Sequence, residues 1–240
     1  MSSRRGKAGG RGSRIGGRRL KTRLKTAKGR KFSSTRWLER QLNDPYVAEA
    51  RRLGYPSRAA FKLIELDDLF HLLGPGLGVV DLGSAPGGWS RVAAERVKAG
   101  HQGGGHVVAL DIAEMEPPPG VTTIRRDFLD ENTPELLAKA LGGPADLVLS
   151  DMSAPVTGHA GTDHLRIVAL AEAALDFAEQ ILAPGGAFVA KVYQGGTERE
   201  LLARMKRLFK RVRHAKPPAS RPASAEVYVV AQGFKGSSGG

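Results

Sequence analysis

Short apolar runs alternate with longer amphipathic stretches along most of this chain. The apolar runs are bounded by glycine, proline or aspartate, as buried strands are, and the stretches between them repeat apolar residues at helical spacing. Strands that alternate with helices favour an α/β fold with a mostly parallel sheet that is covered by helices on both faces. The predicted strands are residues 78–83, 106–112, 121–127, 145–152, 186–193 and 226–234.

The amphipathic stretches predict the helices of the fold. Ser57 is in a position to cap one of them with its hydroxyl group. Further upstream, the stretch after Ser33 is typical of a capped helix that is interrupted near Pro45, because proline has no amide hydrogen to donate. The helices expected after this point are residues 57–70, 88–100, 133–141, 163–182 and 198–209.

Polar residues gather near the carboxyl ends of the predicted strands. Ligands of such sheets bind beyond those ends, in the crevice that the loops form. Polar side chains at one edge are difficult to explain as core packing, so this edge is where we expect a functional site. The residues are Asp81, Asp111, Asp127, Asp151 and Lys191.

Residues 79–90, VVDLGSAPGGWS, form a glycine-rich turn between a strand and a helix. Gly83, Gly87 and Gly88 permit positive φ angles and let a ligand approach the backbone closely, although an ordinary tight turn uses glycine in the same way. The turn does not match G-x-G-x-x-G, and the chain contains no G-x-x-x-x-G-K-[ST]. The sequence therefore disfavours an NAD(P)-dependent oxidoreductase and a phosphate-cradling ATPase or GTPase.

Two acids follow the next two strands. A carboxylate at Asp111 can accept hydrogen bonds from both ribose hydroxyls of a nucleoside, and one at Asp127 can accept the exocyclic amine of adenine. Each acid alone is equally typical of a helix cap or a solvated group. Together with the glycine turn they favour an adenosine-containing ligand, and S-adenosylmethionine fits better than NAD because the turn lacks a phosphate-binding pattern.

Charge is distributed unevenly along the 240 residues. The first 31 residues hold 13 of the 37 lysines and arginines and none of the 24 acids, so this tail carries the whole net charge of +13. It is also rich in glycine and serine and has no aromatic residue until Phe32, which predicts disorder. Such a segment binds phosphate backbones without sequence preference, or merely solubilises the chain. Its charge alone does not separate RNA from DNA or an acidic membrane.

The chain contains no cysteine, so it has neither disulfides nor a Cys-ligated metal site. It has no apolar run of the roughly 20 residues that span a membrane, and its basic N-terminus lacks the apolar region of a secretory signal. We therefore expect a cytoplasmic protein without a membrane partner. No apolar surface helix calls for a second subunit, which favours a monomer.

Motifs between about Ser33 and Phe234 resemble those of the FtsJ/RrmJ-type heat-shock methyltransferases, the 2′-O-ribose methyltransferases of bacterial large-subunit ribosomal RNA. The matching segments, in order, are SSTRWLERQLNDPYV, SRAAFKL, VVDLGSAPGGWS, SDM, APGGAFVAKVYQG and KPPASRPASAEVYVVA. In one place the chain departs from the pattern: the family often has Asp-Met-Ala-Pro-Asn after the fourth strand, whereas this chain has Asp-Met-Ser-Ala-Pro-Val from Asp151. The contacts of that loop are therefore in doubt.

The resemblance implies a Rossmann-like methyltransferase fold, mostly parallel with one antiparallel strand near the C-terminus. It also implies S-adenosylmethionine as methyl donor, no metal, and a nucleotide of 23S ribosomal RNA, a uridine, as acceptor within the large subunit. We accordingly expect a basic disordered tail at residues 1–32, a methyltransferase domain at 33–234 and a disordered tail at 235–240.

The resemblance also implies which residues act. The catalytic set would be Lys62, Asp151, Lys191 and Glu226. The donor-binding residues would be Asp81, Gly83, Gly87, Gly88, Trp89, Asp111, Asp127 and Asp151.

Methyl transfer to a ribose hydroxyl requires that the hydroxyl lose its proton as the new bond forms. Lys191 is the candidate base, since a charge that follows GAFVA in a strand lies at the ligand edge. An alternative is that Lys191 and Lys62 stabilise the developing alkoxide as ammonium groups. Asp151 would then orient Lys191, and Glu226 would fix Lys62 or a substrate hydroxyl.

Other functions remain open at this point. The same residues would serve a methyltransferase acting on transfer RNA or messenger RNA caps, and an RNA-binding assembly factor could retain an inactive methyltransferase scaffold. Basic residues that could bind RNA, or merely solvate a helix face, crowd the predicted helix 198–209 and the residues after it. They are Arg204, Lys206, Arg207, Lys210, Arg211 and Arg213.

Overall fold

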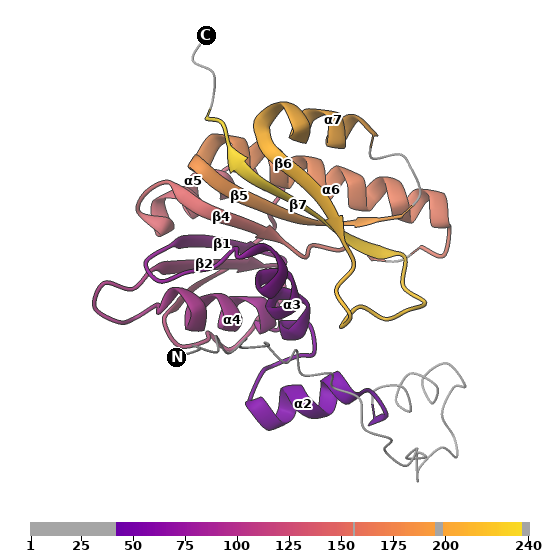
Figure 1. Cartoon of the computed structure of the whole chain (residues 1–240), viewed down its shortest axis with the longest axis horizontal. Helices are drawn as coiled ribbons and strands as arrows, with labels where there is room; N and C mark the ends of the chain where they lie inside the picture. The colour runs from indigo at the N-terminus through magenta and orange to yellow at the C-terminus, as the bar shows by residue number, and fades with distance from the viewer. Residues whose placement is uncertain (1–41, 156, 195–198, 237–240) are drawn as a thin grey trace, which may run out of the picture.

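A computed structural model describes residues 42–155, 157–194 and 199–236 of the chain. Its centre is a single seven-stranded sheet with the strand order β3-β2-β1-β4-β5-β7-β6 (Figure 1). The strands are β1 (Gly78–Leu82), β2 (His106–Asp111), β3 (Val121–Arg125), β4 (Ala145–Ser150), β5 (Leu182–Tyr193), β6 (Phe209–Ala215) and β7 (Glu226–Phe234).

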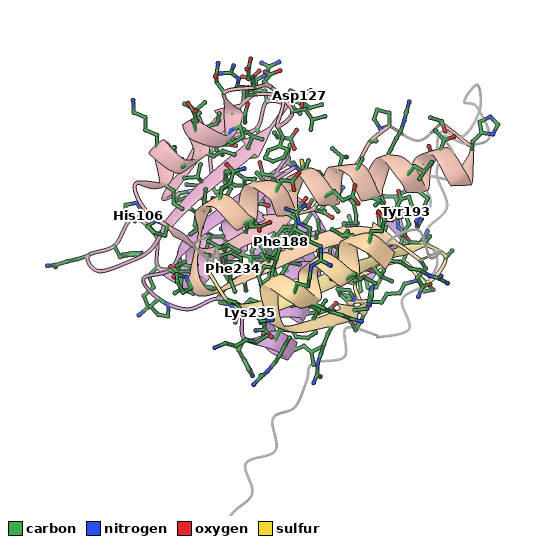
Figure 2. All side chains as sticks on the ribbon, turned by 90° about the horizontal axis from the view of Figure 1, so that it is seen from above. His106, Asp127, Phe188, Tyr193, Phe234 and Lys235 are labelled. Carbon is green, nitrogen blue, oxygen red and sulfur yellow. The ribbon has the colours of Figure 1, made fainter. Side chains whose placement is uncertain are left out.

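Helices cover both faces of this sheet. On one face lie α3 (Ala60–Phe70) and α4 (Gly88–Val97), while α2 (Pro45–Leu53) stands outside α3 (Figure 1). On the other lie α5 (Thr133–Leu141), α6 (Ala160–Ile181) and α7 (Arg199–Leu208). Figure 2 looks on to α6 and α7, which cover Phe188 of β5. The sheet thus separates two hydrophobic clusters, as its runs of apolar residues predict for strands buried on both faces.

The directions of the strands match the expected fold class. β3, β2, β1, β4 and β5 pair in parallel, whereas β7 pairs antiparallel with β5 on one side and with β6 on the other. β7 is therefore the one strand of the sheet that runs against the rest. Since the parallel strands end at the same edge, the residues at their carboxyl ends are brought together.

The sequence prediction missed β6. A helix over residues 198–209 was expected, and the structure ends α7 at Leu208 and begins a strand at Phe209. β6 lies at the edge of the sheet and is exposed at most of its positions, so it lacks the apolar alternation that reveals a half-buried strand. Its basic residues therefore belong to a sheet edge, not to a helix.

The helix boundaries also differ in detail. α2 begins at Pro45, and Asp44 caps it by accepting a hydrogen bond from the backbone N–H of Tyr46. Ser57 was expected to begin α3, yet the helix begins at Ala60, and the hydroxyl of Ser57 accepts the N–H of Ala59 in the preceding turn. The tail at 1–32 and the segment 33–41 lie outside the described residues.

Two kinds of feature are absent from the described residues. No helix in that part of the chain is long and apolar enough to span a membrane. Nor does it contain a group of three histidine, aspartate or glutamate residues arranged to hold a metal ion.

Candidate active site

A cavity of about 600 Å³ opens beyond the carboxyl ends of β1, β2 and β4. Asp111, Asp127 and Asp151 line it, and so does Gly83 of the glycine-rich turn. Much of the remaining lining is apolar, which suits the flat faces of a nucleoside. The apolar lining includes Leu110, Ile112, Phe128, Leu129, Met152 and Leu170.

Asp111 ends β2 and joins that strand to the glycine-rich turn. Its carboxylate accepts hydrogen bonds at 2.8 Å from the backbone N–H of Ala85 in the turn and of Ala113 in its own loop. Asp127 lies two residues after β3, and its carboxylate accepts the N–H of Leu129 at 3.0 Å. Each carboxylate has lone pairs beyond these contacts, so it can accept further hydrogen bonds from a ligand.

Gly83 lets the turn pass close to the loop after β4. Its φ of 75° is in the left-handed region, and a Cβ atom there would lie only 2.7 Å from the backbone of Met152. A side chain at this position would push Met152 and the neighbouring Asp151 out of place. Glycine is thus required where the turn after β1 contacts the loop after β4.

Other predicted donor-binding residues lie behind the turn and do not line the cavity. Gly87 has a φ of 94° and faces Pro118 in the loop after β2. A Cβ on Gly88 would lie 2.7 Å from the Ser57 hydroxyl oxygen and 3.1 Å from the backbone nitrogen of Ala60, so Gly88 permits close packing of α4 against the start of α3. Trp89 is 2% exposed. Its indole N–H donates to the carbonyl of Ala59 at 2.8 Å, which fixes the start of α3.

Asp81 is fully buried within β1. One carboxylate oxygen accepts the hydroxyl of Ser90 at 2.5 Å, while the other oxygen has no hydrogen-bond partner among the residues that the structure describes. Burial raises the pKa of Asp81 to about 7, and the negative charges of Asp151 and Asp111 add to this effect. Asp81 therefore joins the base of the turn to α4 from beneath the site.

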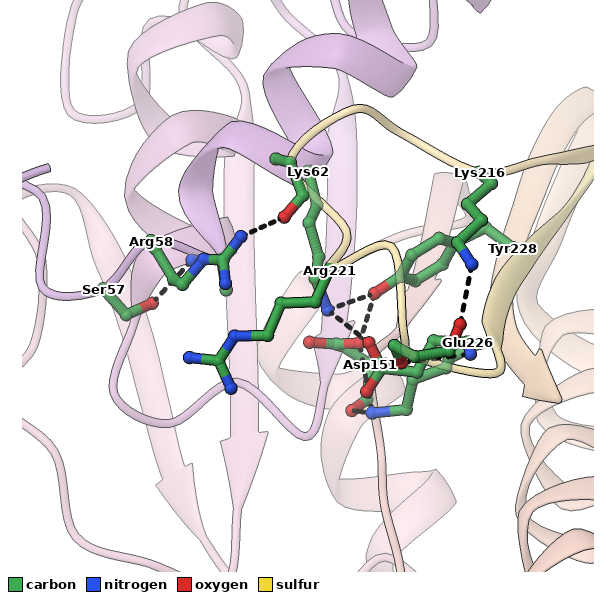
Figure 3. Close-up of polar contacts among 12 residues, drawn as sticks. Ser57, Arg58, Lys62, Asp151, Lys216, Arg221, Glu226 and Tyr228 are labelled. Carbon is green, nitrogen blue, oxygen red and sulfur yellow. Dashed lines mark hydrogen bonds and ion pairs between the residues drawn. The ribbon is translucent and has the colours of Figure 1, made fainter. Parts of the chain in front are cut away.

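A continuous chain of polar contacts crosses the edge of the sheet beside the cavity. Lys62 of α3 donates to Glu226 and to the hydroxyl of Tyr228, both at 3.0 Å, and both partners belong to β7 (Figure 3). The Tyr228 hydroxyl in turn donates to Asp151 at 2.8 Å. Lys191 of β5 completes the chain, 3.2 Å from the carboxylate of Asp151 and 2.6 Å from its carbonyl oxygen.

The structure thus brings together all four residues of the expected catalytic set. They come from α3, the end of β4, β5 and the start of β7, and 164 residues separate Lys62 from Glu226. Asp151 is the residue that the polar chain and the cavity share. A group that occupies the end of the cavity at Asp151 would therefore lie close to Lys191.

Tyr228 was missed by the sequence reasoning, which interpreted it as part of an apolar strand. It is 0% exposed, directly opposite Lys191 in the sheet, and in ring contact with Trp89 at 5.4 Å. Burial, followed by the charge of Asp151 and its hydrogen bond, raises the pKa of Tyr228 well above 10, so the phenol keeps its proton. The position two residues after Glu226, on the same face of the strand, was the signal that could have revealed it.

The strand order, the single reversed strand and the cavity beyond the carboxyl ends define a Rossmann-like methyltransferase domain. The model of the FtsJ-like methyltransferase family matches residues 55–234, and the chain therefore belongs to this family. Membership confirms the resemblance that the sequence motifs indicated, and the α/β methyltransferase fold that it implied.

Similar proteins cover nearly the whole chain. One from Paramagnetospirillum magneticum is 63% identical over 234 residues, which are 97% of this chain and 96% of the relative. One from Parvibaculum lavamentivorans is 57% identical over 245 residues, covering 99% and 96% of the two chains. Both bear the name ribosomal RNA large subunit methyltransferase E.

A solved structure supports the fold. It is a protein from Plasmodium falciparum that is described as a ribosomal RNA methyltransferase. It superimposes with a TM-score of 0.68 at 31% identity, and the match covers 76% of this chain and all of that one.

Proposed function

We propose that this protein transfers a methyl group from S-adenosylmethionine to the ribose 2′-hydroxyl of a nucleotide, a uridine, in 23S ribosomal RNA. The names of its relatives support a large-subunit ribosomal RNA substrate. The observation that carries the proposal is the polar chain from Glu226 to Lys191, which reaches the cavity at Asp151. The enzyme acts as a cytoplasmic monomer in this proposal.

The residues of the cavity fit the methyl donor. Asp111 and Asp127 line it with carboxylates that can accept a ribose hydroxyl and an adenine amine, and apolar side chains between them suit the adenine ring. Gly83 lets the glycine-rich turn pack against Met152, which keeps the neighbouring Asp151 at the wall of the cavity. When bound, the donor supplies a methyl group that its positively charged sulfur already activates.

The remaining chemistry concerns the acceptor hydroxyl. Lys191 is 6% exposed and contacts the carboxylate and the carbonyl oxygen of Asp151, both of which are acceptors for an ammonium group. With its third hydrogen directed to a substrate oxygen, Lys191 stabilises the negative charge that develops there. As a neutral amine it would instead take the hydroxyl proton. In both forms, Asp151 is the group that holds Lys191 in position.

Glu226, at the opposite end of the chain of polar contacts from Lys191, holds the acceptor in place. Glu226 is the more exposed partner in the Lys62 pair, so its free oxygen is accessible to a substrate hydroxyl. Lys62 and Tyr228 connect Glu226 to Asp151, so that the two ends keep a fixed separation. Much of the rate enhancement then comes from alignment of acceptor and donor.

One assay tests this proposal. Purified protein is incubated with methyl-labelled S-adenosylmethionine and large ribosomal subunits, or their naked RNA, from cells that lack the modification. The RNA is then hydrolysed with alkali. A 2′-O-methyl group blocks cleavage at its own nucleotide, so the label is expected in an alkali-resistant dinucleotide.

The same assay separates the alternatives. Label in a mononucleotide would mean that a base is methylated, and would overturn the ribose assignment. Binding of RNA without transfer would support an assembly factor built on an inactive scaffold. Transfer to transfer RNA or to a messenger RNA cap, but not to ribosomal RNA, would change the substrate and keep the chemistry.

A further inference from the structure

The strand β6 carries exposed arginines at the edge of the sheet. Arg211 and Arg213 are exposed, and neither forms an ion pair with any residue in the described part of the chain. Arg204 of the neighbouring α7 differs, because it pairs with Asp176 and Glu179. Because no acid within the described residues pairs with Arg211 or Arg213, their positive charges are available to an external partner.

The register of the sheet places these arginines in line with the catalytic chain. Lys191 of β5 lies opposite Tyr228 of β7, and Tyr228 lies opposite Ala215 of β6. Directly opposite residues point to the same side of a sheet. One row further along β6, Arg213 lies opposite Val230, and two rows along, Arg211 lies opposite Gln232.

The contacts of these rows show which face the arginines occupy. Tyr228, Val230 and Ala215 pack in the cluster beneath α3 and α4, and Gln232 donates to the carbonyl of Phe70 at the end of α3. Arg211 and Arg213 are therefore on the face from which Lys62 enters the site. Successive residues of one face lie roughly 7 Å apart along a strand, comparable with neighbouring phosphates of a nucleic-acid chain.

We propose that Arg211 and Arg213 bind the phosphate backbone of the RNA substrate next to the nucleotide that is methylated. The proposal rests on the proposed function and adds a docking surface to it. Arginine suits this role because its planar guanidinium offers paired donors to phosphate oxygens. The surface leads along β6 to the row of Ala215 and Tyr228, so a strand bound there would deliver the next ribose to Lys191 and Glu226.

The test compares an arginine-deficient enzyme with the wild type. In Arg211→Ala/Arg213→Ala, we expect the KM for deproteinised large-subunit RNA to rise roughly tenfold at moderate salt, with kcat and donor affinity unchanged. The dependence of log KM on log salt should become shallower by about 1.5, because two phosphate contacts no longer release counterions. In Arg211→Lys/Arg213→Lys the salt dependence should return, since the charge is restored.

The matched control removes two other exposed cations, one at the C-terminal cap of α4 and one on α5. Lys98→Asn/Lys139→Ala has the same loss of net charge, and asparagine tolerates the left-handed φ of 59° at residue 98. This control should leave both KM and the salt dependence close to wild type. Equal effects in the two double variants would mean that only net charge matters and would overturn the proposal.

The remaining outcomes also decide the question. Unchanged KM and salt dependence in Arg211→Ala/Arg213→Ala would overturn the docking surface and leave the proposed function intact. Self-association of that variant with unchanged KM would assign the arginines to protection of the exposed sheet edge and would also overturn it. Absence of RNA methylation by the wild type would instead refute the proposed function itself.

Discussion

Asp151 belongs both to the cavity and to the chain of polar contacts beside it, and its position explains how the two are connected. It follows β4 directly, lines the cavity, accepts the hydrogen bond of Tyr228 and pairs with Lys191. A single carboxylate thus fixes the separation between the cavity and the charged side chains at the edge of the sheet. Substitutions at its partners are expected to act through this geometry.

Lys191→Ala should abolish methyl transfer while binding of S-adenosylmethionine survives. Lys191 is nearly buried beside Asp151 and does not line the cavity, so its loss should leave donor binding intact while it removes the group that we propose to act on the acceptor. A fall in kcat of about 10²–10⁴-fold is expected for loss of a positioned acid–base group. Single-turnover methylation and donor titration measure the two quantities, and near-normal turnover would exclude Lys191 from the mechanism.

The pH dependence of stability should report the buried Asp81. Its pKa is about 7 in the folded protein, whereas the ordinary pKa of an exposed aspartate, as in the unfolded chain, is 3.8. Between these values the folded chain holds a proton that the unfolded chain has lost, so stability falls as pH rises from about 4 to 7 and is then constant. Asp81→Asn removes this contribution, which is on the order of a few kcal/mol.

Urea unfolding between pH 4 and 8 checks this expectation. The free energy of unfolding of Asp81→Asn should increase relative to that of the wild type as pH rises to 7, while the contributions of other groups cancel in the comparison. Two curves that remain parallel over this range would show that Asp81 does not titrate as described.

At the scale of elements, the helix that carries Lys62 also anchors the loop that leads to Glu226. Arg58 donates to the carbonyl of Ala219 in the β6–β7 loop, and Glu65 accepts the N–H of the same residue at 2.6 Å. Arg58 lies in the turn that precedes α3, and Lys62 and Glu65 lie one helical turn apart within α3. The common target of Arg58 and Glu65 explains how two segments far apart in sequence keep Lys62 and Glu226 in contact.

Arg58→Ala should therefore weaken both the fold and the reaction. Its guanidinium pairs with Asp44 at 2.7 Å with only 16% and 10% of the two side chains exposed, so the variant leaves a nearly buried carboxylate with only the more distant Arg221, at 3.9 Å, as its ion-pair partner. We expect a loss of about 3 kcal/mol in unfolding free energy and a lower kcat. Arg52→Ala is the matched control, because Arg52 is 66% exposed and solvent screens its ion pair with Glu49. Equal stability of the two variants would contradict this account.

The elements themselves were predictable to very different degrees. The buried parallel strands, and the acids that follow them, can be predicted from the sequence because local apolar runs and glycine turns mark them. β6 was not, because an edge strand with exposed arginines has no apolar alternation. Tyr228 was not either: whether a buried tyrosine fills space or connects two charges depends on the residues opposite it, which only the register of the sheet reveals.

At the scale of the whole molecule, positive charge is the feature that the sequence reveals most directly. The first 31 residues carry 13 lysines and arginines, while the rest of the chain is balanced. The residues proposed to be catalytic all come from the balanced part, between Lys62 and Glu226. In the proposed function, the chemistry and the general attraction to RNA thus belong to different segments of the chain.

Removal of residues 1–32 should consequently weaken RNA binding without altering the site. Association with RNA is driven by release of counterions, so the truncated enzyme should show a higher KM for RNA and a clearly shallower dependence of log KM on log salt. Donor affinity and kcat at saturating RNA should match the full chain, because no residue of the cavity or of the polar chain is removed. Steady-state kinetics at several salt concentrations measure all of these. If KM and its salt dependence stay unchanged, the tail does not contact the substrate, and the arginines of β6 and other folded surfaces would have to supply the attraction.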